Sequence, residues 1–168
     1  NALLIDNQGN HIGKGSKTLN IKAGESINVE QLIGISNPQL WSPETPAIYK
    51  AELSISENGN EKDHISETFG VRTIAYSADK GFLLNGKTVK LNGGCIHHDN
   101  GIIGAAAFDR AEVRKVELMK AAGFNAVRTS HNHPSEAFLH ACDSIGLLVI
   151  DEAFDGWRSP KQPYDYST

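Results

Sequence analysis

The stretch from Phe124 to Glu152 most constrains what this chain can fold into. Asn125 to Thr129 reads as a short buried strand, and a helix is expected to open at Pro134, because the missing N–H of proline is unpaired in a first helical turn in any case. Gly146 ends that helix, and Leu147 to Ile150 is an all-apolar run, typical of a parallel strand covered on both faces. The order strand, helix, strand predicts one unit of an α/β barrel or a doubly wound sheet.

A second unit of the same kind precedes this stretch. Val89 to Ile96 reads as a strand, in which Gly93 and Gly94 imply a close approach of another backbone. A helix is expected from Asp109, with Glu112 three residues later in a capping-box arrangement. The second half therefore predicts strand, helix, strand, helix, strand. Because this is too little to close a barrel, we expect a large part of the fold to lie beyond the last residue.

The first part of the chain carries β-strand signals instead. Ala2 to Ile5 is a short apolar segment, and apolar residues alternate with polar ones over residues 19–21 and 27–29. Ile48 to Ser56 alternates in the same way, and Asn58-Gly59 is a strong hairpin signal after it. Turns at this spacing predict an immunoglobulin-like β-sandwich, and because about five strands are found where about seven are usual, we expect it to be truncated at its amino end.

A proline-rich loop and a second hairpin complete the organisation of the chain. Residues 37–46 contain three prolines, which preclude a central strand or helix, and Trp41 within them is expected to anchor the loop by packing. Asn85-Gly86 is the second hairpin signal. With the boundary near Tyr76, the prediction is a multidomain β plus α/β chain: residues 1–76 a β-sandwich domain, and residues 77–168 the amino-terminal βαβαβ portion of a TIM (β/α)8 barrel.

Composition excludes two classes of partner. Sixteen Lys and Arg residues against twenty Asp and Glu give a net charge of −4 with no basic cluster, which argues against nucleic acid. No apolar run approaches the roughly 20 residues that span a bilayer, so no membrane segment is expected. Cys95 and Cys142 are expected to be buried, reduced thiols, which leaves the compartment open between cytoplasm, periplasm and secretion.

Polar side chains follow all three strands of the second half, at the point where each strand ends. Because the carboxyl ends of parallel strands meet at one rim, we expect these side chains to converge there. Each has a plainer explanation: a lone histidine is often a loop residue, and Arg128 could be a structural ion-pair partner of Asp151 or Glu152. The coincidence of three strand ends favours a functional site. The residues are His97, His98 and Asp99 after the first strand, Arg128 and His131 after the second, and Asp151 and Glu152 after the third.

A metal site is one alternative for these residues. His98, Asp99 and His131 are plausible ligands, but they lack the i, i+4 helical spacing of a hydrolase zinc motif, and no cysteine cluster supports them. We therefore expect no metal and no cofactor in this chain, while a divalent cation stays possible in the full-length protein.

Several motifs resemble glycoside hydrolase family two, which contains β-galactosidases, β-glucuronidases and β-mannosidases, and the resemblance covers nearly the whole chain. Residues 41–46 with Tyr49 are similar to the immunoglobulin-like domain of that family. Residues 69–72 are similar to the segment that leaves this domain, and residues 82–87 to the segment that enters the catalytic barrel. The most specific motif is Asn125-Ala-Val-Arg-Thr-Ser-His131. It is followed by Cys142-Asp143, Gly146 and Asp151-Glu152, as in the family's first signature.

The resemblance implies roles for individual residues. His98 and His131 would line the sugar-binding subsite and contact hydroxyls of the ring whose bond is cut. Arg128 would hold the nucleophilic carboxylate in place, and Asp99 and Asp151 would lie beside these residues as further substrate contacts. The partner implied is an oligosaccharide or glycoside, and the full-length protein is expected to be a homo-oligomer.

The resemblance also implies that no catalytic carboxylate lies within this chain. Both the acid/base Glu and the nucleophile Glu of the family would fall after Thr168. Retaining glycosidases need two carboxyl groups about 5 Å apart, and Asp151 and Glu152, adjacent on a strand, point to opposite faces. We therefore expect a fragment of a retaining β-glycosidase, most similar to a β-galactosidase, that is inactive by itself. One departure is that His133 precedes Pro134 where the family commonly has proline sooner, which affects the expected loop geometry.

Two other functions stay open at this point. The first is a non-catalytic carbohydrate-binding or interaction module that presents Trp41 on its sandwich. The second is a metal-dependent hydrolase that uses His98, Asp99 and His131.

Overall fold

The computed structural model describes residues 1–153 and 163–164. The chain divides into two compact units, the first made of residues 1–41 and 47–72, and the second of residues 42–46 together with the chain from residue 73 on. The units divide just before Tyr76, where the domain boundary was predicted from sequence, and that boundary stays a prediction.

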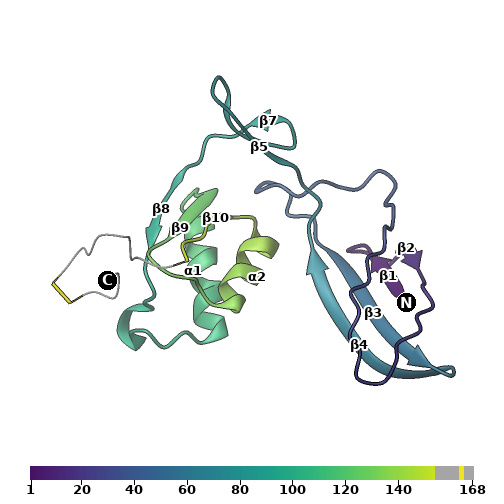
Figure 1. The fold of residues 1–168 in the computed structure, drawn as a ribbon. Helices are drawn as coiled ribbons and strands as arrows, with labels where there is room; N and C mark the ends of the chain where they lie inside the picture. The colour runs from purple at the N-terminus through teal and green to yellow at the C-terminus, as the bar shows by residue number, and fades with distance from the viewer. Residues whose placement is uncertain (154–162, 165–168) are drawn as a thin grey trace. The chain divides into compact units, whose positions relative to one another are not determined.

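The first unit contains one antiparallel sheet with the strand order β2-β1-β3-β4 (Figure 1). Asn58 and Gly59 turn the chain between the two long strands with positive φ angles of 52° and 81°, so the predicted hairpin is confirmed. The strands are β1 (Ala2–Ile5), β2 (His11–Gly15), β3 (Tyr49–Glu57) and β4 (Asn60–Phe69).

An irregular segment covers one face of this sheet. The strands expected over residues 19–21 and 27–29 are wrong, because residues 16–48 contain no strand, whereas β2 was not predicted. The apolar side chains of the segment instead line a hollow together with those of the sheet, among them Leu19, Val29 and Leu53. Leu19, Ile21, Ile27 and Val29 stay 40–48% exposed, so their alternation marks neither a buried face nor a strand paired with a neighbour.

Trp41 is the anchor of the proline-rich loop, as predicted. Its side chain is only 1% exposed, and its backbone N–H donates to the carbonyl oxygen of Val71 at 2.8 Å. The Arg72 guanidinium lies 4.7 Å from the ring centroid, within the range of a cation–π contact. A Cβ on Gly70 would lie 3.1 Å from that of Trp41, so glycine provides the room for the ring. A ring buried in this way offers no face on which a sugar could stack.

The second unit begins with a small antiparallel sheet of β5 (Ile74–Ser77), β6 (Gly81–Leu84) and β7 (Lys87–Thr88). Asn85 and Gly86 connect the last two strands with φ angles of 52° and 76°. Both values lie in the left-handed region that a two-residue hairpin turn requires, which confirms the second predicted hairpin.

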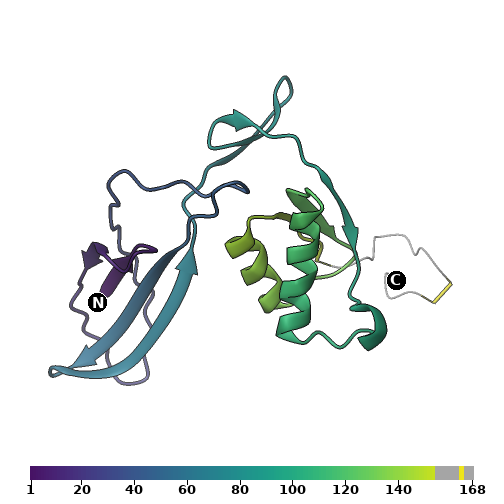
Figure 2. The ribbon, with the colours of Figure 1, turned by 180° about the vertical axis from the view of Figure 1, so that it is seen from behind.

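The rest of the second unit is the predicted strand, helix, strand, helix, strand arrangement. Its three strands form a parallel sheet in the order β10-β9-β8, and helices α1 and α2 lie side by side on one face of it (Figures 1 and 2). The core lies between the sheet and the helices and contains Val116, Val127, Phe138, Cys142 and Leu147. The elements are β8 (Gly93–Ile96), a 3-10 turn (Gly101–Ile103), α1 (Asp109–Ala121), β9 (Ala126–Thr129), α2 (Glu136–Ile145) and β10 (Leu148–Ile150).

Helix α1 begins at Asp109 as predicted, whereas the capping of α1 and the start of α2 differ from the sequence-based expectation. Helix α2 begins after Ser135, whose Oγ accepts a hydrogen bond from the N–H of Phe138 at 3.2 Å, and not at Pro134. The capping box expected at α1 is wrong. Asp109 is already helical and no side chain caps that end, while Glu112 is only 3% exposed and takes other partners. The end of α2 is as predicted, with Gly146 in the left-handed conformation.

Both cysteines are reduced, but their surroundings differ. Cys142 is buried, and burial raises the pKa of its thiol to about 12. Cys95 is exposed, so the expectation of two buried thiols is wrong for this residue. The reason is that Cys95 belongs to the face of the sheet that the helices do not cover.

Within the described part of the chain, no helix is long and apolar enough to cross a membrane.

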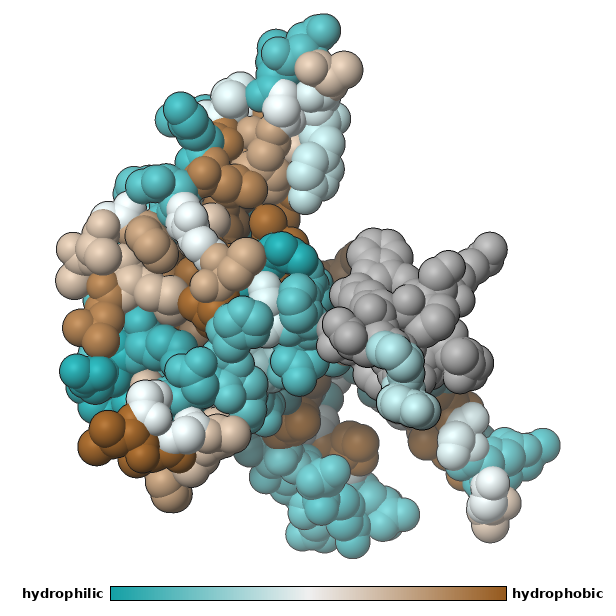
Figure 3. Space-filling view, turned by 90° about the vertical axis from the view of Figure 1, so that its left-hand side faces the viewer, coloured by the Kyte–Doolittle hydropathy of each residue, from teal (hydrophilic) through white to brown (hydrophobic). Residues whose placement is uncertain are grey.

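Some large hydrophobic side chains lie outside the core and are seen at the surface in Figure 3. In the second unit they include Ile102, Phe108 and Leu118, on α1 and in the segment before it. They contribute less to the packing of the described residues than the core between the sheet and its two helices.

Gly93 allows β8 and β9 to pair. A Cβ at this position would lie 1.7 Å from the carbonyl oxygen of Ala126, whereas a Cβ on the adjacent Gly94 has its nearest neighbour at 3.9 Å. The close backbone approach expected from the two glycines is confirmed for Gly93 and wrong for Gly94.

We predict that Gly93→Ala lowers the free energy of unfolding of the second unit by about 3 kcal/mol, because β8 must move away from β9 to make room for the methyl group. Gly94→Ala is the matched control and is expected to change stability by less than about 1 kcal/mol. Urea unfolding followed by circular dichroism measures both. Equal effects of the two substitutions would contradict this account.

Candidate active site at the strand ends

The register of the parallel sheet determines which side chains share its uncovered face. Cys95 on β8 and Ile150 on β10 are both the register partners of Arg128 on β9. Val127, the preceding residue, belongs to the core under the helices. Since successive side chains of a strand point to opposite faces, Arg128 projects from the face away from the helices.

Glu152 joins two of the strand ends through its two carboxylate oxygens. Its Oε1 accepts hydrogen bonds from Nε and Nη2 of Arg128, and its Oε2 lies 3.0 Å from Nδ1 of His131. The third guanidinium nitrogen, Nη1, donates to the Sγ of Cys95 at 3.6 Å. Side chains from all three strand ends therefore meet around Arg128.

These contacts determine the charge of the cluster. Partial burial acts to raise the pKa of Glu152, but the hydrogen bonds from Arg128 and His131 outweigh it, so the pKa of this carboxyl is lowered. The hydrogen bond to Glu152 in turn raises the pKa of Arg128. Glu152 is thus an ionised partner of a fixed cation and lacks the raised pKa of a general acid.

Asp151 takes a different set of partners from its neighbour. Its Oδ1 accepts from the hydroxyl of Thr129 at 3.2 Å, and its Oδ2 lies 2.9 Å from Nδ1 of His133. The two adjacent carboxylates therefore interact with separate groups and do not form a pair.

The structure brings some of the predicted residues together and leaves others apart. His131 and Arg128 meet through Glu152, and the ring of His131 also meets that of His97 edge to face, with centroids 5.8 Å apart. His98 lines a small cavity that His133 also lines. Asp99 lines a different and larger hollow, of about 650 Å³, between β8 and α1.

Glu152, His97 and His133 take part in this cluster but were not among the substrate contacts predicted from sequence. The signal for Glu152 was its position two residues after Ile150, which places it on the same face of the sheet as Arg128. The sequence named Asp151 and Glu152 as alternative ion-pair partners of Arg128, and the parallel register of β9 and β10 decides for Glu152.

The described residues give the metal alternative no support. In residues 1–153 and 163–164, no group of three or more His, Cys, Asp or Glu side chains lies close enough to hold a metal ion. His98, Asp99 and His131, considered as ligands from sequence, do not form such a group.

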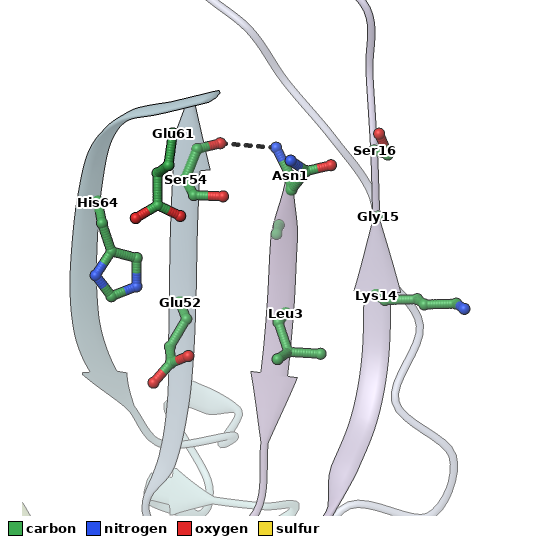
Figure 4. Close-up of a pocket in the computed structure, with 10 residues that line it drawn as sticks. Asn1, Leu3, Lys14, Gly15, Ser16, Glu52, Ser54, Glu61 and His64 are labelled. Carbon is green, nitrogen blue, oxygen red and sulfur yellow. Dashed lines mark hydrogen bonds between the residues drawn. The ribbon is translucent and has the colours of Figure 1, made fainter. Parts of the chain in front are cut away.

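A second hollow, of about 620 Å³, lies in the first unit on the polar face of its sheet (Figure 4). Glu52, Glu61 and His64 from β3 and β4 line it, together with Asn1, whose amino group donates to the carbonyl oxygen of Ser54 at 2.8 Å. The hydrogen bond from Lys50 lowers the pKa of Glu52 against the effect of desolvation. This carboxylate is therefore satisfied by a surface ion pair and is not a candidate acid.

We predict that Glu152 makes the second unit sensitive to acid. Because the pKa of Glu152 is lower in the folded chain than its ordinary value of 4.5, its contribution to stability is complete above that pH and is lost as the pH falls through the folded-state pKa. Glu152→Gln should therefore flatten the decline of the urea midpoint between pH 5 and pH 3.

The control for this measurement is Glu25→Gln, which changes an exposed carboxylate in the irregular segment and should keep the steeper decline of the original chain. If Glu152→Gln and the original chain lose stability in parallel over this pH range, the ion pair with Arg128 does not form in solution.

Comparison with known proteins identifies the family. A family model described as "Glycosyl hydrolases family 2, TIM barrel domain" matches residues 77–158, and one described as "Glycosyl hydrolases family 2" matches residues 2–72. The chain thus carries the fold that was expected, the family's β-domain followed by the beginning of its TIM barrel.

Individual relatives agree with these matches. The chain is 38% identical over 164 residues to a β-galactosidase named BoGH2A from Bacteroides ovatus, which covers 98% of this chain and 19% of that protein. A β-glucuronidase from Bacteroides fragilis is 32% identical over 143 residues, covering 84% of this chain and 20% of that protein.

Solved structures give the same result. The crystal structure of a family 2 glycosyl hydrolase from Bacteroides cellulosilyticus matches with a TM-score of 0.93 and 47% identity, over 99% of this chain and 21% of that one. The chain therefore spans about a fifth of the length of these relatives. With both of its units matched in order, the chain belongs to family 2 of the glycosyl hydrolases.

Proposed function

We propose that this chain is part of a retaining β-glycosidase that removes terminal β-linked sugars, with a β-galactosidase as the nearest functional type. The observation that carries the proposal is the meeting of Arg128, Glu152 and His131 at the carboxyl ends of two neighbouring strands of the parallel sheet, the edge at which TIM-barrel enzymes build their sites. The names of the relatives, β-galactosidases and β-glucuronidases, support the same reaction class.

The proposed roles follow from the chemistry of each side chain. His98 and His131 supply ring nitrogens that can donate to or accept from sugar hydroxyls, and Asp99 and Asp151 supply acceptors beside them. Arg128 positions the nucleophilic carboxylate. Its planar guanidinium has five N–H donors, and Glu152 and Cys95 together take one from each of the three nitrogens, so one N–H on Nη1 and one on Nη2 are left for a second carboxylate.

The catalytic carboxylates themselves are proposed to come from outside this chain. A retaining glycosidase needs one carboxyl group with a raised pKa and a second about 5 Å away as nucleophile. Glu152 has a lowered pKa and an arginine partner, and Asp151 interacts with His133 and Thr129. Neither is suited to protonate a leaving oxygen.

The first test compares the chain with the product of its complete reading frame. We expect no turnover of nitrophenyl β-galactoside or nitrophenyl β-glucuronide by residues 1–168 alone, and steady turnover of one of them by the complete protein with retention of anomeric configuration by NMR. Turnover by the chain alone would refute the placement of the catalytic groups, and inversion of configuration would refute the mechanism.

A second test probes the histidine contact in the complete protein. His131→Ala is expected to lower kcat/KM by about 10- to 100-fold, the loss typical of one hydrogen bond to a charged or polarised group. His140→Ala, at an exposed position on α2, is the matched control and should leave kcat/KM unchanged. Similar kinetics for both variants would remove His131 from the sugar site.

A further inference from the structure

A small cavity with several polar residues in its lining lies at the carboxyl end of the sheet, on the side covered by the helices. It measures about 20 Å³ and is lined by residues from the ends of β8 and β9 and from α1 and α2, including Ser130, Glu112, Lys115 and Phe138. A cavity needs about 10–15 Å³ to hold one water molecule, so this one has room for a single water and not for a larger ligand.

Ser130 lines this cavity with a hydroxyl that lacks a partner. The residue is 5% exposed, and its Oγ is the one buried side-chain oxygen or nitrogen without a hydrogen bond among the residues described here. A buried hydroxyl left unpaired costs about 1–3 kcal/mol, and folded proteins seldom keep such groups unsatisfied. We therefore expect a hydrogen-bonding partner for the Ser130 hydroxyl.

Glu112 supplies an acceptor to the lining of the same cavity. This carboxylate is 3% exposed, and its Oε1 accepts from the side chain of Asn100 at 2.7 Å and from Lys115 at 3.2 Å. Both of these hydrogen bonds end on the same oxygen, which leaves Oε2 for a further donor. Lys115, 5.9 Å from the ring centroid of Phe138, borders the same space.

We infer that this cavity binds one ordered water molecule, held by Ser130 Oγ, the second carboxylate oxygen of Glu112 and the ammonium group of Lys115. Water suits the site because it can donate to the carboxylate while it accepts from the ammonium and exchanges a hydrogen bond with the hydroxyl. Three polar partners are the usual number for a buried water.

The bound water connects two segments that bear histidines. Ser130 directly precedes His131, and its backbone N–H donates to the carbonyl oxygen of Ile96 at 2.8 Å. Glu112, through Asn100, holds the loop that follows His98. The water thus completes a buried polar link from the end of β9 to the loop after β8. This inference stands independently of the proposed glycosidase function.

A high-resolution crystal structure of the unaltered chain tests the site directly. The expected result is a well-ordered density peak within about 3.2 Å of both Ser130 Oγ and the Glu112 carboxylate. An empty cavity, or one filled by a rotated side chain, would overturn the inference.

The sign of a stability change gives a second test in solution. If water partners the hydroxyl, Ser130→Ala loses a hydrogen bond and should lower the melting temperature by about 2–4 °C. If the hydroxyl is unpaired, removing it should leave the melting temperature unchanged or raise it, which would overturn the inference. Ser135→Ala is the control, because that hydroxyl accepts a hydrogen bond from the N–H of Phe138 at 3.2 Å at the start of α2 and its loss should lower the melting temperature.

A double-mutant cycle separates a water bridge from two independent effects. No direct hydrogen bond joins Ser130 and Glu112 among the described residues, so a water molecule between them is the link that would make Ser130→Ala and Glu112→Gln non-additive. We expect the combined shift in melting temperature to be smaller than the sum of the single shifts. Additive shifts would refute the bridge.

Discussion

The parallel pairing of β9 with a strand on each side is the constraint on which the second unit depends. At the start of the strands, Asn125 fixes the register, because its side-chain oxygen accepts from the N–H of Asn92 at 2.7 Å and its amide donates to the carbonyl oxygen of Lys90 at 3.0 Å. Gly93 then permits the close approach of the backbones. At the other end of the sheet, this register places Arg128 between Cys95 and Ile150. The site is therefore a consequence of strand pairing.

Charge compensation explains how the strand ends can lie so close together. A partly buried carboxylate is costly unless a cation and hydrogen bonds accompany it. Glu152 has both in Arg128 and His131, whereas Asp151 has hydrogen-bonding partners in His133 and Thr129. Each acidic side chain at this edge therefore has partners of its own, which fix its orientation.

Sequence periodicity predicted the second unit better than the first. Leu147 to Ile150 and the glycine after α2 mark a buried strand and a helix end by local chemistry alone, and both are found in the structure. Residues 19–21 and 27–29 show an equally regular alternation without forming strands, because the hydrogen-bonding partner that a strand needs is not visible in its own sequence. The capping role predicted for Glu112 is wrong for a similar reason. Its spacing from Asp109 fits a cap, but tertiary packing turned it toward Asn100.

The sequence by itself determined the order of strands and helices from β8 to β10, the two hairpins, the end of α2 at Gly146 and the family, because each of these depends on residues close together along the chain. Only the tertiary structure decided that Arg128 pairs with Glu152 and not with Asp151, and that Cys95 is exposed. The physical reason is that a side chain's face and its partners depend on the register between strands. Residues far apart in the chain set that register jointly, and no single segment encodes it.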